Sequence, residues 1–147
     1  MTTFELIKQM PYSAAAVYEQ LCNMEQYVEA MKNIERVTVL SRAEHTAETQ
    51  WEATLDGRKL TWTEEDVYDR EARTIEYRLI EGDFSEMSGN WHVEDMADGG
   101  CCVTFNVSFA FGIPMLAMFV EPILKRKLEE NSHMLLDGIA AYLNTKQ

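Results

Sequence analysis

Cysteine, proline and glycine are all scarce in this chain of 147 residues. It has three cysteines, three prolines and seven glycines. Cys22, Cys101 and Cys102 form neither a disulfide framework nor a spacing typical of metal ligands, and no glycine-rich phosphate-binding loop is present. We therefore predict no metal site, no cofactor and a reducing compartment, which points to the cytoplasm.

Positive charge is also in short supply. Thirteen lysines and arginines stand against 25 aspartates and glutamates, which gives a net charge of −12. Nucleic acids and anionic membrane surfaces are bound through clustered basic residues. The composition therefore argues against nucleic acid as a partner, and the acidic residues between positions 64 and 98 suit a solvated outer face.

Long hydrophobic runs are missing as well. The longest, Ile113–Val120, is too short to cross a bilayer, and the first residues, MTTFELIKQMPYS, lack the pattern of a signal peptide. We expect no transmembrane segment. With 46% hydrophobic residues, residues 1–147 are long enough to form one domain with a substantial core.

Alternation of apolar and polar residues dominates the middle of the chain and predicts strands. Helical spacing predicts two short helices near the N-terminus, over 14–22 and 24–31, and a long one over 122–143. Asp56-Gly57 is a hairpin signal, and a change of phase near Glu65 indicates a β-bulge. The expected strands cover residues 3–9, 34–40, 46–55, 59–68, 74–80, 85–95 and 101–111.

The long C-terminal helix has one apolar stripe with an amide inside it. Residues expected on the polar side are Lys125, Glu129, Ser132, His133 and Ala140, and those expected on the buried side are Leu124, Leu128, Asn131, Leu135, Gly138 and Tyr142. A buried amide needs hydrogen-bond partners. Two interpretations of Asn131 stay open: it bonds a neighbouring backbone group, or it faces a cavity.

Ile113–Val120 is apolar on all sides and is followed closely by Pro122. Proline suits the first turn of a helix and breaks its interior. We therefore predict a short helical segment before Glu121 and the main helix after it. The apolar segment is interpreted either as packing on the sheet edge, or as a lid, or as a contact surface for a homodimer or a protein partner.

The predicted sheet has more large apolar side chains on one face than one helix can cover. Successive tight hairpins make such a sheet antiparallel, and its apolar face must be covered. Only the C-terminal helix is long enough, so we expect a strongly curved sheet gripping one helix. An apolar cavity left between them is the usual form of a small-molecule site.

With these elements in place, the chain resembles the START-like helix-grip (SRPBCC, Bet v1-like) superfamily, of the polyketide cyclase/dehydrase or coenzyme-Q-binding type. The motif Glu81-Gly82-Asp83-Phe84 with Gly89-Asn90-Trp91 and the closing helix carry the resemblance. It implies an α+β fold in the order β-α-α-β6-α, with a curved seven-stranded antiparallel sheet wrapped around the last helix. It also implies a tunnel that binds lipids, quinones, polyketides or hormones.

Some members of that superfamily catalyse aromatic ring closure and dehydration, with an arginine a few residues after a tryptophan proposed to steady an enolate. Here Trp62 is followed by Glu64, Glu65 and Asp66, with no arginine before Arg70. A carboxylate cannot replace a cationic oxyanion stabiliser. This departure argues against aromatase activity.

Two sets of candidate site residues follow. Glu64, Asp66 and Tyr77 are the catalytic candidates, because desolvation of an inward carboxyl raises its pKa and a phenol can donate to a ligand carbonyl. The candidate ligand-binding residues are Trp51, Trp62, Tyr77, Met87, Trp91, Phe105, Phe109, Leu128, Asn131 and Leu135.

Three functions remain open. The first is binding of a hydrophobic or aromatic small molecule, such as a lipid, quinone or polyketide. The second is a polyketide cyclase, aromatase or dehydratase acting in the same cavity, and the third is a protein-interaction module with a closed pocket. A cavity of several hundred cubic ångströms favours the first two, and a collapsed core favours the third.

Overall fold

The computed structural model describes residues 1–55 and 57–146. It shows the predicted order of elements. Three of them have the predicted bounds, the other strands are one or two residues longer, and the predicted helix over 24–31 divides into a 3-10 helix and a short α-helix. The elements are β1 (Thr2–Met10), α1 (Ala14–Cys22), the 3-10 helix η1 (Met24–Gln26), α2 (Tyr27–Ala30), β2 (Ile34–Arg42), β3 (Thr46–Leu55), β4 (Arg58–Asp69), β5 (Thr74–Gly82), β6 (Phe84–Asp95), β7 (Cys101–Phe111) and α3 (Pro114–Asn144).

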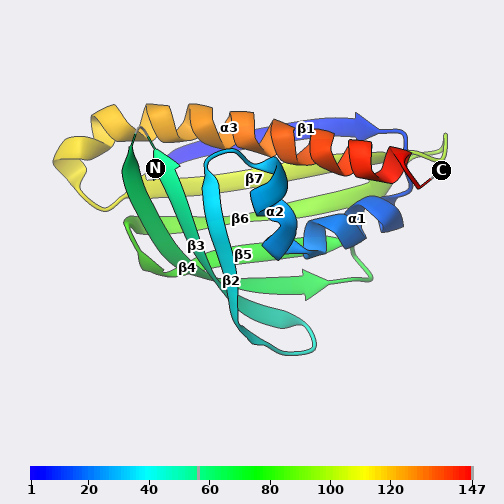
Figure 1. The fold of residues 1–147 in the computed structure, drawn as a ribbon, viewed down its shortest axis with the longest axis horizontal. Helices are drawn as coiled ribbons and strands as arrows, with labels where there is room; N and C mark the ends of the chain where they lie inside the picture. Colours follow the sequence, from blue (N-terminus) through cyan, green and yellow to red (C-terminus); the bar gives the residue numbers. More distant parts are fainter. Residues whose placement is uncertain (56, 147) are drawn as a thin grey trace.

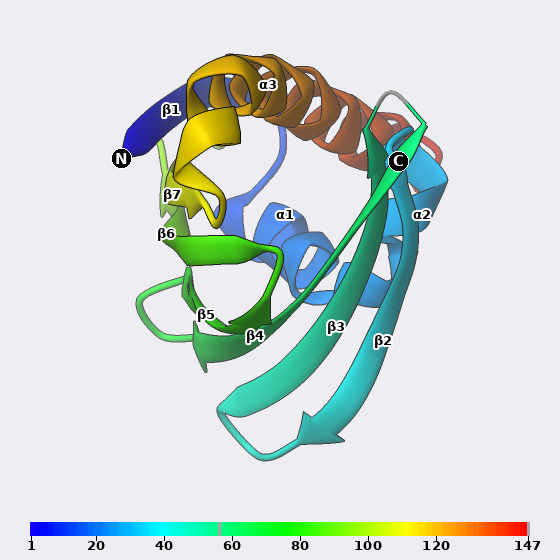
Figure 2. The same cartoon turned by 90° about the vertical axis from the view of Figure 1, so that its left-hand side faces the viewer.

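The seven strands form one antiparallel sheet in the order β1-β7-β6-β5-β4-β3-β2. Figure 1 shows α3 lying along the sheet beside β1, and Figure 2 shows the sheet curling, with α3, α1 and α2 on its concave side. This arrangement confirms the predicted α+β helix-grip fold. Among the described residues, no helix combines the length and apolar composition needed to span a bilayer.

The concave face of the sheet carries the core. In β7, buried and half-buried residues alternate along the whole strand, because successive side chains point to opposite faces. The inward residues join those of α1, η1 and the second half of α3 in one large cluster that includes Leu21, Ile75 and Leu136, each fully buried.

Strand β4 contains the predicted irregularity. Its pairing with β5 shifts between Thr63 and Glu64, one residue before the predicted position near Glu65. A bulge lets two consecutive residues face the same way, and both Thr63 and Glu64 are buried. Asp56 of the preceding hairpin lies outside the described residues, while Gly57 has the positive φ of 80° that a type I′ turn requires.

The predicted break before Pro122 is wrong: α3 runs as one helix from Pro114 to Asn144, with Pro122 inside it. Both sides of the proline are held by packing, which outweighs the lost backbone hydrogen bond. Ala117, Val120, Ile123 and Leu124 pack against a small cluster of Leu55, Leu60 and Phe111.

A hydrogen-bonded carboxylate adds to this packing. Glu121, just before the proline, accepts hydrogen bonds from the Phe111 backbone N–H (3.0 Å) and from Thr2 Oγ1 (2.6 Å). Thus the neighbouring residue ties the helix to β7 and β1 at the position where a break was predicted.

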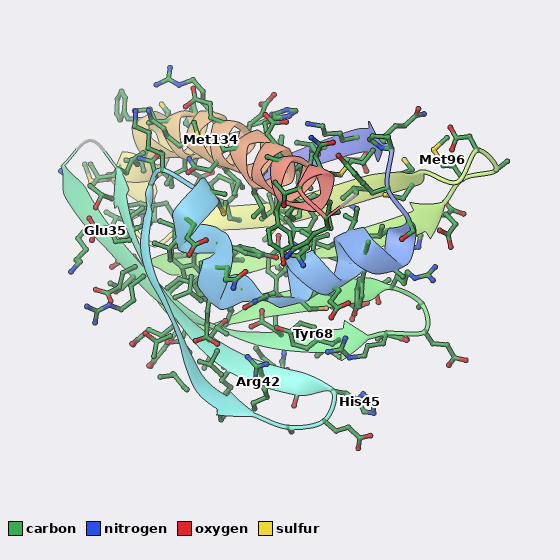
Figure 3. All side chains as sticks on the ribbon, turned by 45° about the vertical axis from the view of Figure 1, so that its right-hand side comes forward. Glu35, Arg42, His45, Tyr68, Met96 and Met134 are labelled. Carbon is green, nitrogen blue, oxygen red and sulfur yellow. The ribbon has the colours of Figure 1, made fainter. Side chains whose placement is uncertain are left out.

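The buried stripe of α3 is also wider than predicted. Ser132, placed on the polar side from the sequence, is fully buried, whereas Tyr142, placed on the buried side, is 46% exposed. The short helices cover an additional side of α3, as shown by the close approach of Ala30 to Gly138, where an added Cβ would lie 3.0 Å from the Ala30 Cβ. Met134 lies at the outer surface of the helix, as Figure 3 shows.

Replacing the proline inside α3 should stabilise the protein. Pro122 is exposed, so Pro122→Ala removes no buried contact, restores a backbone N–H donor and relieves the ring clash with the preceding turn. We expect the free energy of unfolding to rise by about 2 kcal/mol in urea titrations. Pro114→Ala, at the first helical position where proline costs little, is the control. Equal changes in unfolding free energy for the two substitutions would contradict the interpretation that Pro122 destabilises the interior of α3.

Candidate functional site

A half-open cavity lies between the concave face of the sheet and the helices. Its volume is about 150 Å³, and its walls come from β3 to β7, from α3 and from the segment Met24–Ile34. A cavity of this size holds a molecule as large as benzene. It is smaller than the several hundred cubic ångströms that we expected for a ligand-binding protein, and it is not the closed core expected for an interaction module.

Aromatic rings make up much of the wall. Trp51 and Trp62 are paired across β3 and β4 and stack with ring centroids 5.7 Å apart and planes inclined by 6°. Phe84 meets the Trp62 ring edge-on at 5.5 Å. Across β6 and β7, Trp91 and Phe105 stack at 4.0 Å. Each ring is held by its neighbour, so the wall offers large, rigid apolar faces to a ligand.

Most of the residues predicted to bind a ligand line this cavity. One does not: Leu135 is buried in the core and lies outside the lining, whereas Leu124 and Leu128 of the same helix contribute to it. The ligand-binding role of all the predicted residues stays a prediction. The predicted residues that do line the cavity are Trp51, Trp62, Tyr77, Met87, Trp91, Phe105, Phe109, Leu128 and Asn131.

The Tyr77 ring lines the cavity, but its hydroxyl group has a partner in the sheet. It donates to the Asn106 carbonyl oxygen at 3.0 Å. The approach is possible because Gly89 has no side chain: a Cβ there would lie 2.5 Å from the Tyr77 hydroxyl oxygen and 2.0 Å from the Asn106 carbonyl oxygen. This tyrosine therefore presents its ring, rather than its polar end, to the cavity.

Asn131 lines the cavity and is also fully hydrogen-bonded, so both interpretations of this amide hold in part. Its Oδ1 accepts from the Asn33 backbone N–H at 3.0 Å, and its Nδ2 donates to Asn33 Oδ1 at 2.9 Å and to the Lys127 carbonyl at 2.7 Å. The paired amides join α3 to the chain just before β2. The pair thus fixes the position of the helix over the sheet.

Glu64 and Asp66 lie next to one another on β4, and both are buried, with exposed fractions of 5% and 0%. Glu64 lines the cavity, while Asp66 lies behind it. Glu64 Oε1 accepts from Trp62 Nε1 at 2.9 Å, and Asp66 Oδ2 accepts from Thr49 Oγ1 at 2.6 Å. The second oxygen, Asp66 Oδ1, has no hydrogen-bond partner among the described residues.

This environment keeps a proton on the pair. Burial raises the pKa of Glu64 well above its usual range, and the adjacent Asp66 carboxyl raises it further. Burial also raises the pKa of Asp66, but the hydrogen bonds that it accepts from Glu64 and Thr49 oppose that shift. Glu64 is therefore the acid of the pair, and Asp66 is the group that accepts its hydrogen bond.

Ser132 is a cavity residue that the sequence did not predict. Its side chain is fully buried and lines the cavity, and its hydroxyl has no hydrogen-bond partner among the described residues. It was missed because it stands beside Asn131, one position off the apolar stripe. Phe84 was also missed as a cavity residue because it was assigned to a turn, although it contacts Trp62 directly.

No group of three or more histidine, cysteine, aspartate or glutamate side chains within residues 1–55 and 57–146 is arranged to hold a metal ion. His45 and His133 are exposed, and Figure 3 shows His45 at the end of the β2–β3 hairpin, far from the helices. The polar chemistry of the cavity thus rests on oxygen and amide groups, with Glu64 as the main titratable group.

The chain belongs to the family described as "Polyketide cyclase / dehydrase and lipid transport", whose model matches residues 10–135. The match confirms the resemblance predicted from the sequence motifs. No curated protein sequence matches the chain.

Several solved structures superpose closely on the chain. TTHA0849 from Thermus thermophilus has a TM-score of 0.87 and 22% identity, over 99% of each chain. The Zhui aromatase/cyclase from Streptomyces sp. R1128 has a TM-score of 0.84 and 19% identity, over 96% of this chain and 92% of the other. A START superfamily protein from Mycobacterium smegmatis has a TM-score of 0.78 and 13% identity, over 99% of each chain. At these identities the likeness establishes the fold alone.

The raised pKa of Glu64 predicts how stability changes with pH. The ordinary pKa of a glutamate side chain is 4.5. At pH values above it, the folded protein holds the Glu64 proton more tightly than the unfolded chain does. The stability that the proton contributes is therefore complete below that value and is lost as the pH rises toward the folded-state pKa. Glu64→Gln cannot ionise, so its unfolding free energy should fall less steeply with pH than that of the native protein.

Urea unfolding at several pH values between about 5 and 8 measures these slopes. Glu76→Gln is the control, because Glu76 is exposed on β5 and carries the same change of charge. We expect its slope to match that of the native protein. A slope unchanged by Glu64→Gln would show that Glu64 ionises alike in the folded and unfolded states.

Proposed function

We propose that the protein binds a hydrophobic or aromatic small molecule in the cavity between the sheet and α3. The observation that supports this most strongly is the half-open cavity lined by three tryptophans and further aromatic side chains. Apolar, concave sites with few polar groups are the usual form of small-molecule sites. Membership of a polyketide cyclase and lipid transport family supports the same class of ligand. The resemblance seen in the sequence implies lipids, quinones or polyketides as members of this class.

The size of the cavity narrows this proposal. About 150 Å³ accepts one aromatic ring or a short aliphatic chain without rearrangement. A larger ligand would have to extend beyond the cavity or displace side chains of its lining.

Glu64 supports a second candidate function, that of a cyclase, aromatase or dehydratase. A carboxylic acid held in an apolar cavity can donate a proton to a substrate oxygen, as general acids in enzymes do. Tyr77 contributes its ring to such a site, since its hydroxyl is bound to Asn106. The closed-pocket interaction module lacks a matching observation, because the cavity is open.

Filling the cavity should prevent binding. Ala53 lies on β3, is 8% exposed and lines the cavity, so the ring in Ala53→Phe would occupy ligand space. With phenol as the probe, we expect calorimetry to show affinity at least tenfold weaker than in the native protein. Ala110→Phe, on the outer phase of β7, should change affinity less than twofold. Equal affinities in both variants, each checked for folding by circular dichroism, would refute binding in this cavity.

A contact surface at the start of α3 is a separate part of the proposal. Met115, Met118 and Phe119 are 86%, 78% and 71% exposed, and a cluster of large exposed apolar side chains commonly marks an association site. We take a second copy of this chain as its partner, which gives a homodimer through Ile113–Val120. The cytoplasmic location, like the choice of a lipid as ligand, stays a prediction from the sequence.

Phe119→Glu tests this surface, because a charge at the centre of an apolar contact costs several-fold or more in affinity. Sedimentation velocity of the native protein should show a dimer that Phe119→Glu shifts toward the monomer by at least tenfold in dissociation constant. Glu129→Gln, at an exposed position further along α3, should leave the dimer unchanged. A native protein that sediments as a monomer at high concentration would contradict the dimer.

A further inference from the structure

The hydrogen bonds around Glu64 and Asp66 account for one proton shared by the two carboxyl groups. Trp51 Nε1 donates to Thr49 Oγ1 at 2.8 Å, so the Thr49 hydroxyl proton is free to go to Asp66 Oδ2, 2.6 Å away. The other oxygen, Asp66 Oδ1, is buried and has no hydrogen-bond partner among the described residues. A proton kept on the adjacent Glu64 carboxyl group would fill this position. One proton on two carboxyl groups leaves the pair with one negative charge.

That charge has no positive partner within residues 1–55 and 57–146. None of the ion pairs formed by lysine, arginine or histidine involves Glu64 or Asp66. Lys127 lines the cavity, but its Nζ lies 3.8 Å from Glu130 Oε2 at the surface. A buried charge without a counter-charge is costly. A ligand that supplies a positive charge would remove this cost.

The helix side of the cavity has a second open hydrogen-bonding position. Ser132 Oγ on α3 is fully buried and without a partner among the described residues, and it lines the same cavity as Glu64. The Tyr77 hydroxyl donates to the Asn106 carbonyl, and the Asn131 amide is tied to Asn33 and Lys127. Glu64 accepts only from Trp62 of its own strand, and Ser132 has no described partner, so these two groups are the most available to a ligand.

We propose that the Glu64–Asp66 pair is the anchor for a protonated amine carried on an aromatic or aliphatic group. This rests on the proposed function, ligand binding in the cavity, and names the chemical class of the ligand. The ammonium group donates to Glu64, whose oxygens have lone pairs beyond the Trp62 bond, and to Ser132 Oγ. The ligand enters already protonated, so no covalent bond forms or breaks. The faces of Trp51 and Trp62 add attraction for a cation.

A matched set of probes tests this proposal on the whole protein. Phenethylamine, 2-phenylethanol and 3-phenylpropionate have nearly the same size and carry charges of about +1, 0 and −1 at neutral pH. Their affinities can be measured by chemical-shift titration of the labelled protein at one pH and at physiological salt. We expect the amine to bind at least tenfold more tightly than the alcohol, and the carboxylate to bind most weakly.

Substitutions locate the preference. Glu64→Gln with Asp66→Asn keeps the shapes and most hydrogen bonds while removing the charge, and should bring the amine and alcohol affinities within twofold of each other. Glu76→Gln, an exposed change of charge on β5, should leave the tenfold preference intact and thereby exclude a general effect of the acidic surface. Ser132→Ala should weaken the affinity for the amine by about threefold to tenfold, as expected for one lost hydrogen bond.

The outcomes separate this inference from the proposed function. Equal affinities for the amine and the alcohol in the native protein would overturn the inference and leave ligand binding in place. A preference for the amine that survives the double substitution would also overturn it, since the charge would then act from elsewhere. Failure of all three probes to bind would overturn the proposed function together with the inference.

Discussion

The concave face of the sheet carries more apolar surface than the helices cover, and the other features of the site depend on this excess. Seven antiparallel strands curl around a single long helix, and α1, η1 and α2 close only one end of the space. Where α1 and the end of α3 meet the sheet, side chains such as Leu21, Leu136 and Ile139 are buried. Between β3 to β7 and the middle of α3, a space of about 150 Å³ remains.

Polar groups in and around this space divide into two kinds. The Asn33–Asn131 amide pair and the Tyr77–Asn106 hydrogen bond hold the helix and the strands in place. The Glu64–Asp66 pair is different, because it brings a charge into an apolar environment without a basic partner among the described residues. A buried charge that costs stability is a candidate for function rather than for folding.

Much of the fold could be predicted from local patterns. Residues alternate so regularly in Cys101–Phe111 that the predicted strand and β7 coincide, and the bulge in β4 was visible as a break in phase. The break before Pro122 was wrong because the rule for proline is local, whereas the packing of Ile123 and Leu124 against Leu55 and Phe111 is not. Tertiary contacts outweighed a backbone preference.

The site was harder to predict, because it depends on tertiary contacts that local sequence patterns do not show. Rings on one face of a sheet can be placed in a cavity wall from their phase, as Trp51 and Trp62 were. The direction of a polar end cannot be read from phase: the Tyr77 hydroxyl turns away through the gap at Gly89. Ser132 was assigned to the solvent side because it stands one position off the apolar stripe, although its side chain lines the cavity. The cavity volume depends on how all these side chains settle, so it was overestimated.

The central claim is that the space between the tryptophan-lined sheet and α3 is unfilled and open to small apolar molecules. A crystal structure of the protein under xenon pressure tests it most directly, because xenon occupies apolar cavities without needing polar contacts. The account predicts a xenon atom bounded by Trp51, Trp62 and Leu128. An interior without xenon at that place, with side chains of the protein filling the space, would contradict it.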